Sequence, residues 1–105
     1  MDSRRRVVWA RPALDALNDA LAYIAEESPK GAASIASAAL ASADSLSTLA
    51  ERGRVVPEIG RPAIREIFVF RYRLLYRVGS DRVTGIAFLH GARDFESWRR
   101  GLGDL

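Results

Sequence analysis

The sequence contains no cysteine, a single lysine and a single histidine. Without cysteine the chain can form no disulfide bond, and it has neither a thiol nucleophile nor a thiolate metal site. No segment approaches the roughly eighteen apolar residues that a membrane-spanning helix requires, so we expect no membrane partner. The basic N-terminus is soon followed by Trp9 and Arg11. That pattern is unlike a signal peptide, and we predict a cytoplasmic protein.

Motifs typical of independent enzymes are missing as well. The sequence has no glycine-rich phosphate loop and no nucleophile elbow. It also has no cluster of histidine, aspartate and glutamate with the spacing of metal ligands. We therefore expect no cofactor and no metal ion.

What the chain does contain is an excess of arginine. Fifteen of its sixteen basic residues are arginine, Lys30 is the exception, and the formal net charge is +3. The planar arginine fork suits both carboxylates and phosphates, which points to an acidic protein partner or to nucleic acid. A GC-rich genome alone would produce the same bias, so this alternative stays open.

The length and apolar content predict one folded domain. The chain has 105 residues, of which 49% are hydrophobic. That content makes disorder improbable, and the length supports a single modest core. We predict one domain that covers residues 1–105.

The N-terminal half has the pattern of a strand followed by a helical hairpin. Residues 5–9 are β-branched and aromatic, which favours a strand. Pro12 suits the first turn of a helix, and apolar residues follow at helical spacing at Leu14, Leu17, Leu21 and Ile24. Ser28 is a good N-cap for a second helix over residues 30–52, which Gly53 would end in the left-handed conformation.

The C-terminal half changes to the period of two that is typical of strands. After a linker over residues 54–62, we predict strands at residues 64–69, 72–78 and 82–90. Residues 79–81 (GSD) form a plausible hairpin turn. A short terminal helix would begin with Asp94 as its cap and end at Gly101 and Gly103. The order β-α-α-β-β-β predicts an α+β domain in which a helical hairpin packs on a small antiparallel sheet.

Four motifs in this half make the chain resemble the RelE/ParE toxin superfamily. They are EIGR at residues 58–61, IREI at residues 64–67, YRLLYRV at residues 72–78 and LHGARDF at residues 89–95. Each motif is short, but their order and spacing are specific. The ending HGARDF resembles the ParE branch more than the RelE branch.

The resemblance implies the toxin component of a type II toxin–antitoxin system. A ParE-like toxin would inhibit growth by binding DNA gyrase, and a cognate antitoxin would neutralise it. The antitoxin would cover the toxin with a segment, often acidic, near its C-terminus. Operator DNA would be bound only indirectly, through the antitoxin. A relative that has lost toxicity and only binds an antitoxin is a further alternative.

The RelE branch offers an enzymatic alternative, a ribosome-dependent mRNA interferase. Such an endoribonuclease needs cations at the scissile phosphate and groups that move protons. The resemblance matches Arg73 and Arg93 to basic residues of the family, and Arg65 and His90 complete the candidate catalytic set, with Glu66 as an alternative base. The lysines and the terminal tyrosine of the RelE branch are missing, and Trp98 and Arg99 occupy the region of that tyrosine. We therefore favour a toxin that acts by binding and leave the enzyme question open.

The same side chains are candidates for binding the target or the antitoxin. This set comprises Arg65, Arg73, Arg77, Arg93 and Trp98. Each has a structural alternative. Arg73 and Arg77 share one strand face and could form ion pairs, while His90 could be a structural hydrogen-bonding group. Tyr72 and Tyr76 are expected in the core, and Phe95 and Trp98 are expected to attach the terminal helix to the sheet edge.

Overall fold

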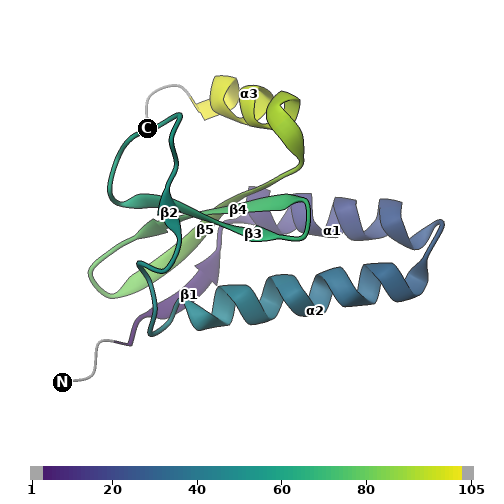
Figure 1. Ribbon diagram of the computed structural model, residues 1–105, viewed down its shortest axis with the longest axis horizontal. Helices are drawn as coiled ribbons and strands as arrows, with labels where there is room; N and C mark the ends of the chain where they lie inside the picture. Colours follow the sequence, from purple (N-terminus) through teal and green to yellow (C-terminus); the bar gives the residue numbers. More distant parts are fainter. Residues whose placement is uncertain (1–3, 103–105) are drawn as a thin grey trace.

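The computed structural model describes residues 4–102, which form a five-stranded sheet with helices on both of its faces. The elements are β1 (Arg6–Trp9), α1 (Arg11–Ala25), α2 (Pro29–Ser45), β2 (Arg54–Val55), β3 (Ile64–Val69), β4 (Tyr72–Val78), β5 (Arg82–Leu89) and α3 (Gly91–Leu102). The α1–α2 hairpin packs on one face of the sheet and α3 on the other, and α3 lies above the strands in Figure 1. The predicted α+β class is confirmed. No helix among the described residues is long and apolar enough to cross a membrane.

The sheet is mixed rather than wholly antiparallel. Its strand order is β1-β5-β4-β3-β2, and β1 runs parallel to β5, with Arg6 opposite Arg82. The other three pairs are antiparallel, and two of them, β3–β4 and β4–β5, are the hairpins that the sequence predicts. Strand β2 was expected to be part of a linker. It is a two-residue edge strand because Arg54 and Val55 pair with Glu66 and Arg65 of β3.

The helical hairpin begins as the sequence predicts and ends earlier. The Ser28 hydroxyl accepts a hydrogen bond from the Gly31 N–H at 2.9 Å, which caps α2. Helix α2 ends at Ser45 instead of residue 52, and the chain continues in turns. The left-handed conformation predicted for Gly53 is wrong, since only Gly60 and Gly91 have positive φ among the described glycines.

Two apolar clusters hold the layers together, one on each face of the sheet. The larger cluster joins the hairpin to the sheet and includes Leu17, Ala39, Leu46, Ile67, Leu74, Tyr76, Val83 and Phe88. The smaller cluster joins α3 to the opposite face and includes Val56, Ile64, Leu75, Ala87, Leu89 and Phe95. The predicted alternation of β4 is confirmed, with Leu74 and Tyr76 facing the hairpin and Leu75 facing α3.

Helix α3 starts at Gly91, three residues before the predicted cap. The Asp94 carboxylate still accepts a backbone hydrogen bond, at 2.9 Å. The donor is the N–H of His90, the residue that directly precedes the helix. Phe95 is 1% exposed and fixes α3 to the face of the sheet, not to its edge. The predicted helix end at Gly103 lies outside the described residues.

The two hairpin turns differ in strain. At the turn predicted between β4 and β5, the Gly79 N–H donates to the Arg82 carbonyl at 2.8 Å. Between β3 and β4 only Phe70 and Arg71 make the turn, and Phe70 has a φ of 54°. A residue that has a Cβ rarely adopts that left-handed backbone conformation.

Candidate functional site

Arg73, on the α3 face of β4, is enclosed by two carboxylates. Its Nε donates to Glu66 Oε1 at 2.5 Å, and its Nη1 and Nη2 donate to Glu58 Oε2 and Oε1 at 3.0 and 2.9 Å. The Glu66 side chain is fully buried, and that of Arg73 is 12% exposed. Each nitrogen of the fork therefore has a carboxylate partner inside the protein.

The same cluster ties β2 and α3 to the sheet. Arg54 Nε donates to the second oxygen of Glu66 at 2.6 Å, so the buried carboxylate has an arginine on each oxygen. The Arg73 guanidinium also lies 4.9 Å from the centre of the Phe95 ring, a cation–π contact. The structural alternative given for the arginines of β4, that they form ion pairs, describes Arg73.

Hydrogen bonding stabilises the charged forms of this cluster. The hydrogen bonds from Arg73 hold the pKa of Glu58 below its usual value, against a smaller opposing effect of burial. The hydrogen bonds with Glu58 in turn raise the pKa of Arg73 further above its already high value. Arg73 is thus a permanent cation whose charge is neutralised locally.

Arg65 points to the other face of the sheet, towards the helical hairpin. It stands opposite Tyr76 in the β3–β4 ladder, whereas Arg73 stands opposite Phe68. Its Nη1 donates to the Gly53 carbonyl at 3.0 Å, and its buried Nε has no hydrogen-bond partner among the residues that the structure describes. Arg65 thus supports the chain between α2 and β2.

Within the part of the chain that the structure describes, none of the remaining candidate residues forms a hydrogen bond or an ion pair with Arg73. Arg77 and Arg93 are exposed on β4 and α3. His90 is exposed at the end of β5, with its ring centre 4.9 Å from that of Tyr72. Trp98 is half-buried, and its ring lies 5.6 Å from that of Phe95.

The four candidate catalytic residues therefore do not converge on one place. Arg65 and Arg73 lie on opposite faces of the sheet, and His90 is next to Tyr72, which packs against the hairpin core. The described residues also contain no group of histidine, aspartate and glutamate that could hold a metal ion. The structure brings Arg73 together with Glu66, the alternative base, but both oxygens of that buried carboxylate already accept from arginines, and Arg65 lies on the other face of the sheet.

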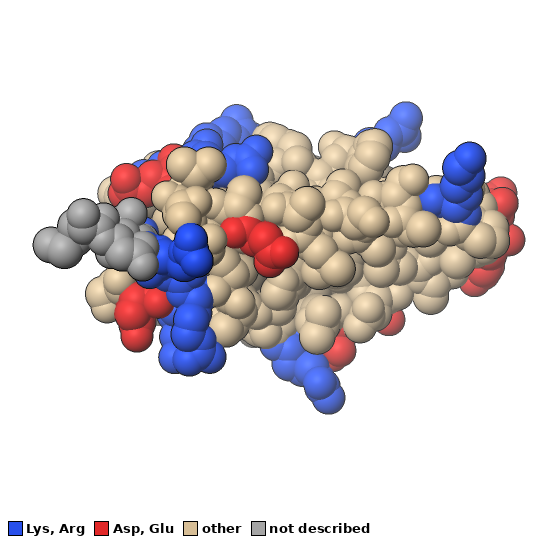
Figure 2. Space-filling model, turned by 90° about the horizontal axis from the view of Figure 1, so that it is seen from below, with Lys and Arg blue, Asp and Glu red and all other residues tan. Residues whose placement is uncertain are grey.

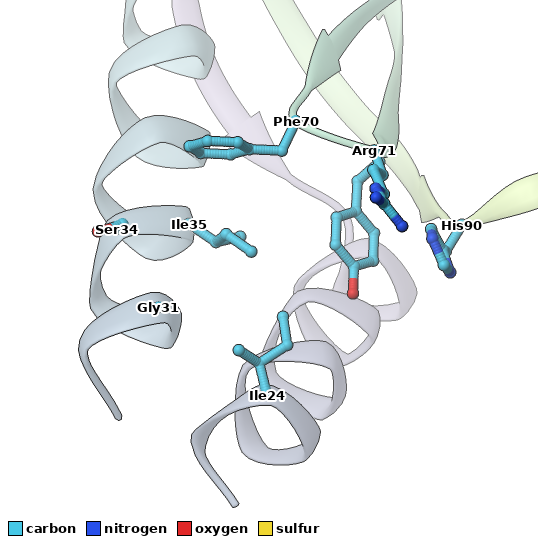
Figure 3. A pocket seen from close by; sticks show the side chains of 8 residues that line it. Ile24, Gly31, Ser34, Ile35, Phe70, Arg71 and His90 are labelled. Atoms are coloured by element: carbon cyan, nitrogen blue, oxygen red, sulfur yellow. The ribbon is translucent and has the colours of Figure 1, made fainter. Parts of the chain in front are cut away.

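The structure also contains a groove between the helical hairpin and the β3–β4 turn, which was not predicted from the sequence. A hollow of about 510 Å³ is lined by Ile24 of α1, Ile35 of α2, Phe70 of the turn and Tyr72 of β4, with Arg71 and His90 at its edge. Figure 3 shows that the side chains of Phe70, Ile35 and Ile24 point towards the hollow. One sequence signal was available: a phenylalanine stands in a two-residue turn that has no glycine or asparagine.

The charged side chains seen from the helical side do not form one continuous basic surface. In Figure 2 the lysine and arginine side chains gather near the edges, acidic side chains lie among them, and the middle is largely uncharged. Exposed positions of α2 are mainly small, such as Ala33, Ser37 and Ala41. This face therefore lacks the broad basic footprint that nucleic-acid binding favours.

Comparisons with known proteins agree on the family and the fold. A family model described as "ParE toxin of type II toxin-antitoxin system, parDE" matches residues 7–95. A chain in the solved structure of the chromosomal ParDE TA system from P. aeruginosa is similar in fold, with a TM-score of 0.69 and 16% sequence identity. That match covers 86% of this chain and 99% of the other. No protein with curated annotation matches the sequence.

Proposed function

Because the chain belongs to the ParE toxin family of type II toxin–antitoxin systems, we propose that it inhibits growth by binding DNA gyrase and that a cognate antitoxin neutralises it. In this proposal it acts in the bacterial cytoplasm, where gyrase and the antitoxin are found. Operator DNA is bound only indirectly, through the antitoxin.

The enclosure of Arg73 carries the proposal for a binding mechanism. A ribonuclease would need this arginine to contact the scissile phosphate or the charge that develops on it. Here its three nitrogens already donate to Glu58 and Glu66, and only 12% of the side chain is exposed. A phosphate would have to displace Glu58, which is 38% exposed, from Nη1 and Nη2, or break the pair with the fully buried Glu66, which is costly.

The mRNA interferase remains the alternative, and its requirements are less well met. Arg65 faces the hairpin, Arg93 is exposed on α3, and His90 lies by Tyr72. Catalysis by these groups would need a substrate that reaches both faces of the sheet at once. A binding toxin requires only an accessible surface, so it agrees better with this arrangement.

A supercoiling assay tests the proposed target. Purified toxin is added to gyrase, relaxed plasmid and ATP, and we expect supercoiling to fall with toxin concentration and to recover when the antitoxin is added first. Transcript ends are mapped in parallel after the toxin is induced in cells. Unchanged supercoiling at high toxin concentration, together with codon-phased cuts in mRNA, would overturn the proposal in favour of the interferase.

Growth assays test the toxin–antitoxin relationship separately from the target. We expect growth arrest when the chain is induced alone and normal growth when its cognate antitoxin is co-expressed. Normal growth in both cultures, with the chain present in soluble form, would indicate a relative that has lost toxicity.

A further inference from the structure

We propose that the face of the sheet opposite the helical hairpin binds the phosphate backbone of duplex DNA through Arg6, Arg77 and Arg82. These three side chains are called the arginine face below. The proposal rests on the gyrase target proposed above and adds a second contact to it: the toxin binds the enzyme and also the DNA on which the enzyme acts. Phosphate contacts carry no sequence information, so recognition of an operator still belongs to the antitoxin.

The arginine face lies on the side of the sheet that the hairpin does not cover. Successive side chains of a strand point to opposite faces. Each of the three arginines directly adjoins a residue of the apolar cluster beneath the hairpin, and these neighbours are Val7, Tyr76 and Val83. The arginines therefore point away from the hairpin, and all three are exposed.

The pairing of the strands brings the three arginines close together. Arg6 stands opposite Arg82 in the parallel β1–β5 pair. Arg77 stands opposite Thr84, two residues along β5 from Arg82. With strands about 4.8 Å apart and a rise of about 3.3 Å per residue, the Cα atoms of Arg6 and Arg77 both lie within about 10 Å of that of Arg82. Duplex DNA carries one charge per roughly 1.7 Å of its axis, so the face can meet several phosphates at once.

The positive charge of the arginine face is not neutralised within the part of the chain that the structure describes. None of its side chains forms an ion pair there, in contrast to Arg73. Strands β1, β4 and β5 contain no aspartate or glutamate. Asp81, exposed in the turn before β5, forms no ion pair with the three arginines either. The arginine fork suits phosphate, so this side of the sheet has the basic footprint that the helical side lacks.

The same surface lacks the anchors on which a protein partner would depend. All four aromatic residues of β1, β4 and β5 belong to the cluster on the hairpin side, and they are Trp9, Tyr72, Tyr76 and Phe88. Beside the arginines stand Val8 and Thr84, which are half-buried. Protein interfaces depend on a centre of buried aromatic and apolar side chains. Phosphate contacts need cations on a surface that the backbone can approach, so the face fits DNA better than an acidic protein.

Substitution of all three arginines by glutamine tests the DNA contact. Fluorescence anisotropy measures the affinity of the purified toxin for a short labelled duplex while the salt concentration is raised. At about 50 mM salt, the affinity of the triple variant Arg6→Gln, Arg77→Gln, Arg82→Gln should be roughly tenfold or more below that of the unmodified toxin. The slope of log affinity against log salt should become shallower by about 2–3, because each lost phosphate contact removes about 0.9.

The matched control is the triple variant Arg11→Gln, Lys30→Gln, Arg71→Gln. It removes the same number of positive charges at exposed positions outside the arginine face. Its DNA affinity and salt slope should stay close to those of the unmodified toxin, and melting temperatures show that both triple variants are folded. Equal weakening by the two variants would overturn the face. A flat salt slope for the unmodified toxin would also overturn it, without reliance on any variant.

The contact with the DNA of gyrase is tested by comparing two forms of the enzyme. The affinity of the toxin is measured for immobilised gyrase alone and for gyrase loaded with DNA. We expect the unmodified toxin to bind the loaded enzyme more tightly, because it gains the phosphate contacts. The variant that lacks the arginine face should bind the two forms equally.

The outcomes separate the arginine face from the gyrase target. If the toxin inhibits supercoiling but the loss of the arginine face leaves its DNA affinity unchanged, the face is not a DNA site although the gyrase target stands. DNA binding through the face without inhibition of gyrase would overturn the gyrase target and the contact with its DNA. Weaker binding of the face variant to gyrase alone would assign the face to an acidic protein surface. Tighter binding of single-stranded RNA than of duplex DNA would assign it to RNA, and either result would overturn the proposal.

Discussion

Arg73 on β4 and Glu66 on β3 form an ion pair in which the carboxylate is fully buried, with Arg73 Nε donating to Glu66 Oε1 at 2.5 Å. Arg54 binds the other oxygen of Glu66, so the carboxylate is satisfied on both sides. Buried ion pairs are weak contributors as a whole but costly to break from one side. We therefore expect Arg73 to contribute chiefly to the stability of the fold and less to the binding of a ligand.

Arg73→Ala should destabilise the fold. The substitution leaves Glu66 buried with a single partner and removes the cation above Phe95, which together should lower the free energy of unfolding by about 3 kcal/mol. Urea denaturation followed by circular dichroism measures this loss. Arg77→Ala is the matched control, since Arg77 is exposed on the same strand, and its effect should stay within about 0.5 kcal/mol. Equal stability of the two variants would contradict a structural role for Arg73.

The stability of the protein should depend on pH through Glu58. Its folded pKa is lowered from 4.5, chiefly by hydrogen bonds from Arg73. A lowered folded pKa gives stability that is present above the unfolded value and is lost as pH falls through the folded value. The difference in melting temperature between the unmodified protein and Glu58→Gln should thus be full at pH 7 and should vanish progressively below pH 4.5.

Salt provides the control for the Glu58 effect. The Glu58 side chain is 38% exposed, so added salt should screen its pairing with Arg73. At pH 7, salt should therefore reduce the difference in melting temperature between the unmodified protein and Glu58→Gln. Glu51→Gln is the matched control variant, because it changes another exposed carboxylate that lies outside the cluster. A pH profile of Glu58→Gln that runs parallel to the unmodified profile from pH 7 to pH 3 would rule out the predicted linkage.

Tyr76 should contribute through its hydroxyl as well as its ring. Its side chain is buried among the core of the hairpin face, and the hydroxyl donates to the Ala50 carbonyl at 2.8 Å and accepts from the Gly53 N–H at 3.0 Å. Tyr76→Phe leaves both backbone groups without this partner, so unfolding should become easier by about 1–3 kcal/mol. Tyr23→Phe, at a position that is 71% exposed, should change stability by less than about 0.5 kcal/mol. Similar unfolding curves for both variants would show that water or a small shift replaces the lost bonds.

Regular elements could be predicted because their patterns are local. The bounds of β3 and β4 match the period-two segments, and Ser28 caps α2 as its type and position indicate. The end of α2 was misjudged because Leu46 and Leu49 continue the helical spacing into turns that follow Ser45. Strand β2 could not be found locally, since two residues become a strand only by pairing with β3.

The site was harder to predict because its contacts join distant residues. The types and positions of Arg73 and Glu66 were noted in the sequence, and their opposite charges suit a pair. Glu58 reaches Arg73 from fifteen residues away through the loop before β3, and no periodic pattern specifies that path. The groove depends on how the hairpin lies against the β3–β4 turn, which only the packed structure determines.

Gly53 should be intolerant of alanine even though its φ is not left-handed. A Cβ at Gly53 would lie 2.5 Å from the Tyr76 hydroxyl and closer still to the backbone oxygen of Glu66. Because the Glu66 backbone belongs to β3 and cannot move freely, the added methyl group must push β2 away from its partner. We expect Gly53→Ala to cost about 1–3 kcal/mol, as overpacked sites do. Gly101→Ala, where nothing lies within 4 Å of the added Cβ in α3, should be neutral or stabilising by up to about 1 kcal/mol. Urea denaturation of both variants measures the contrast, and a Gly53→Ala protein as stable as the unmodified one would mean that β2 can leave β3 without loss.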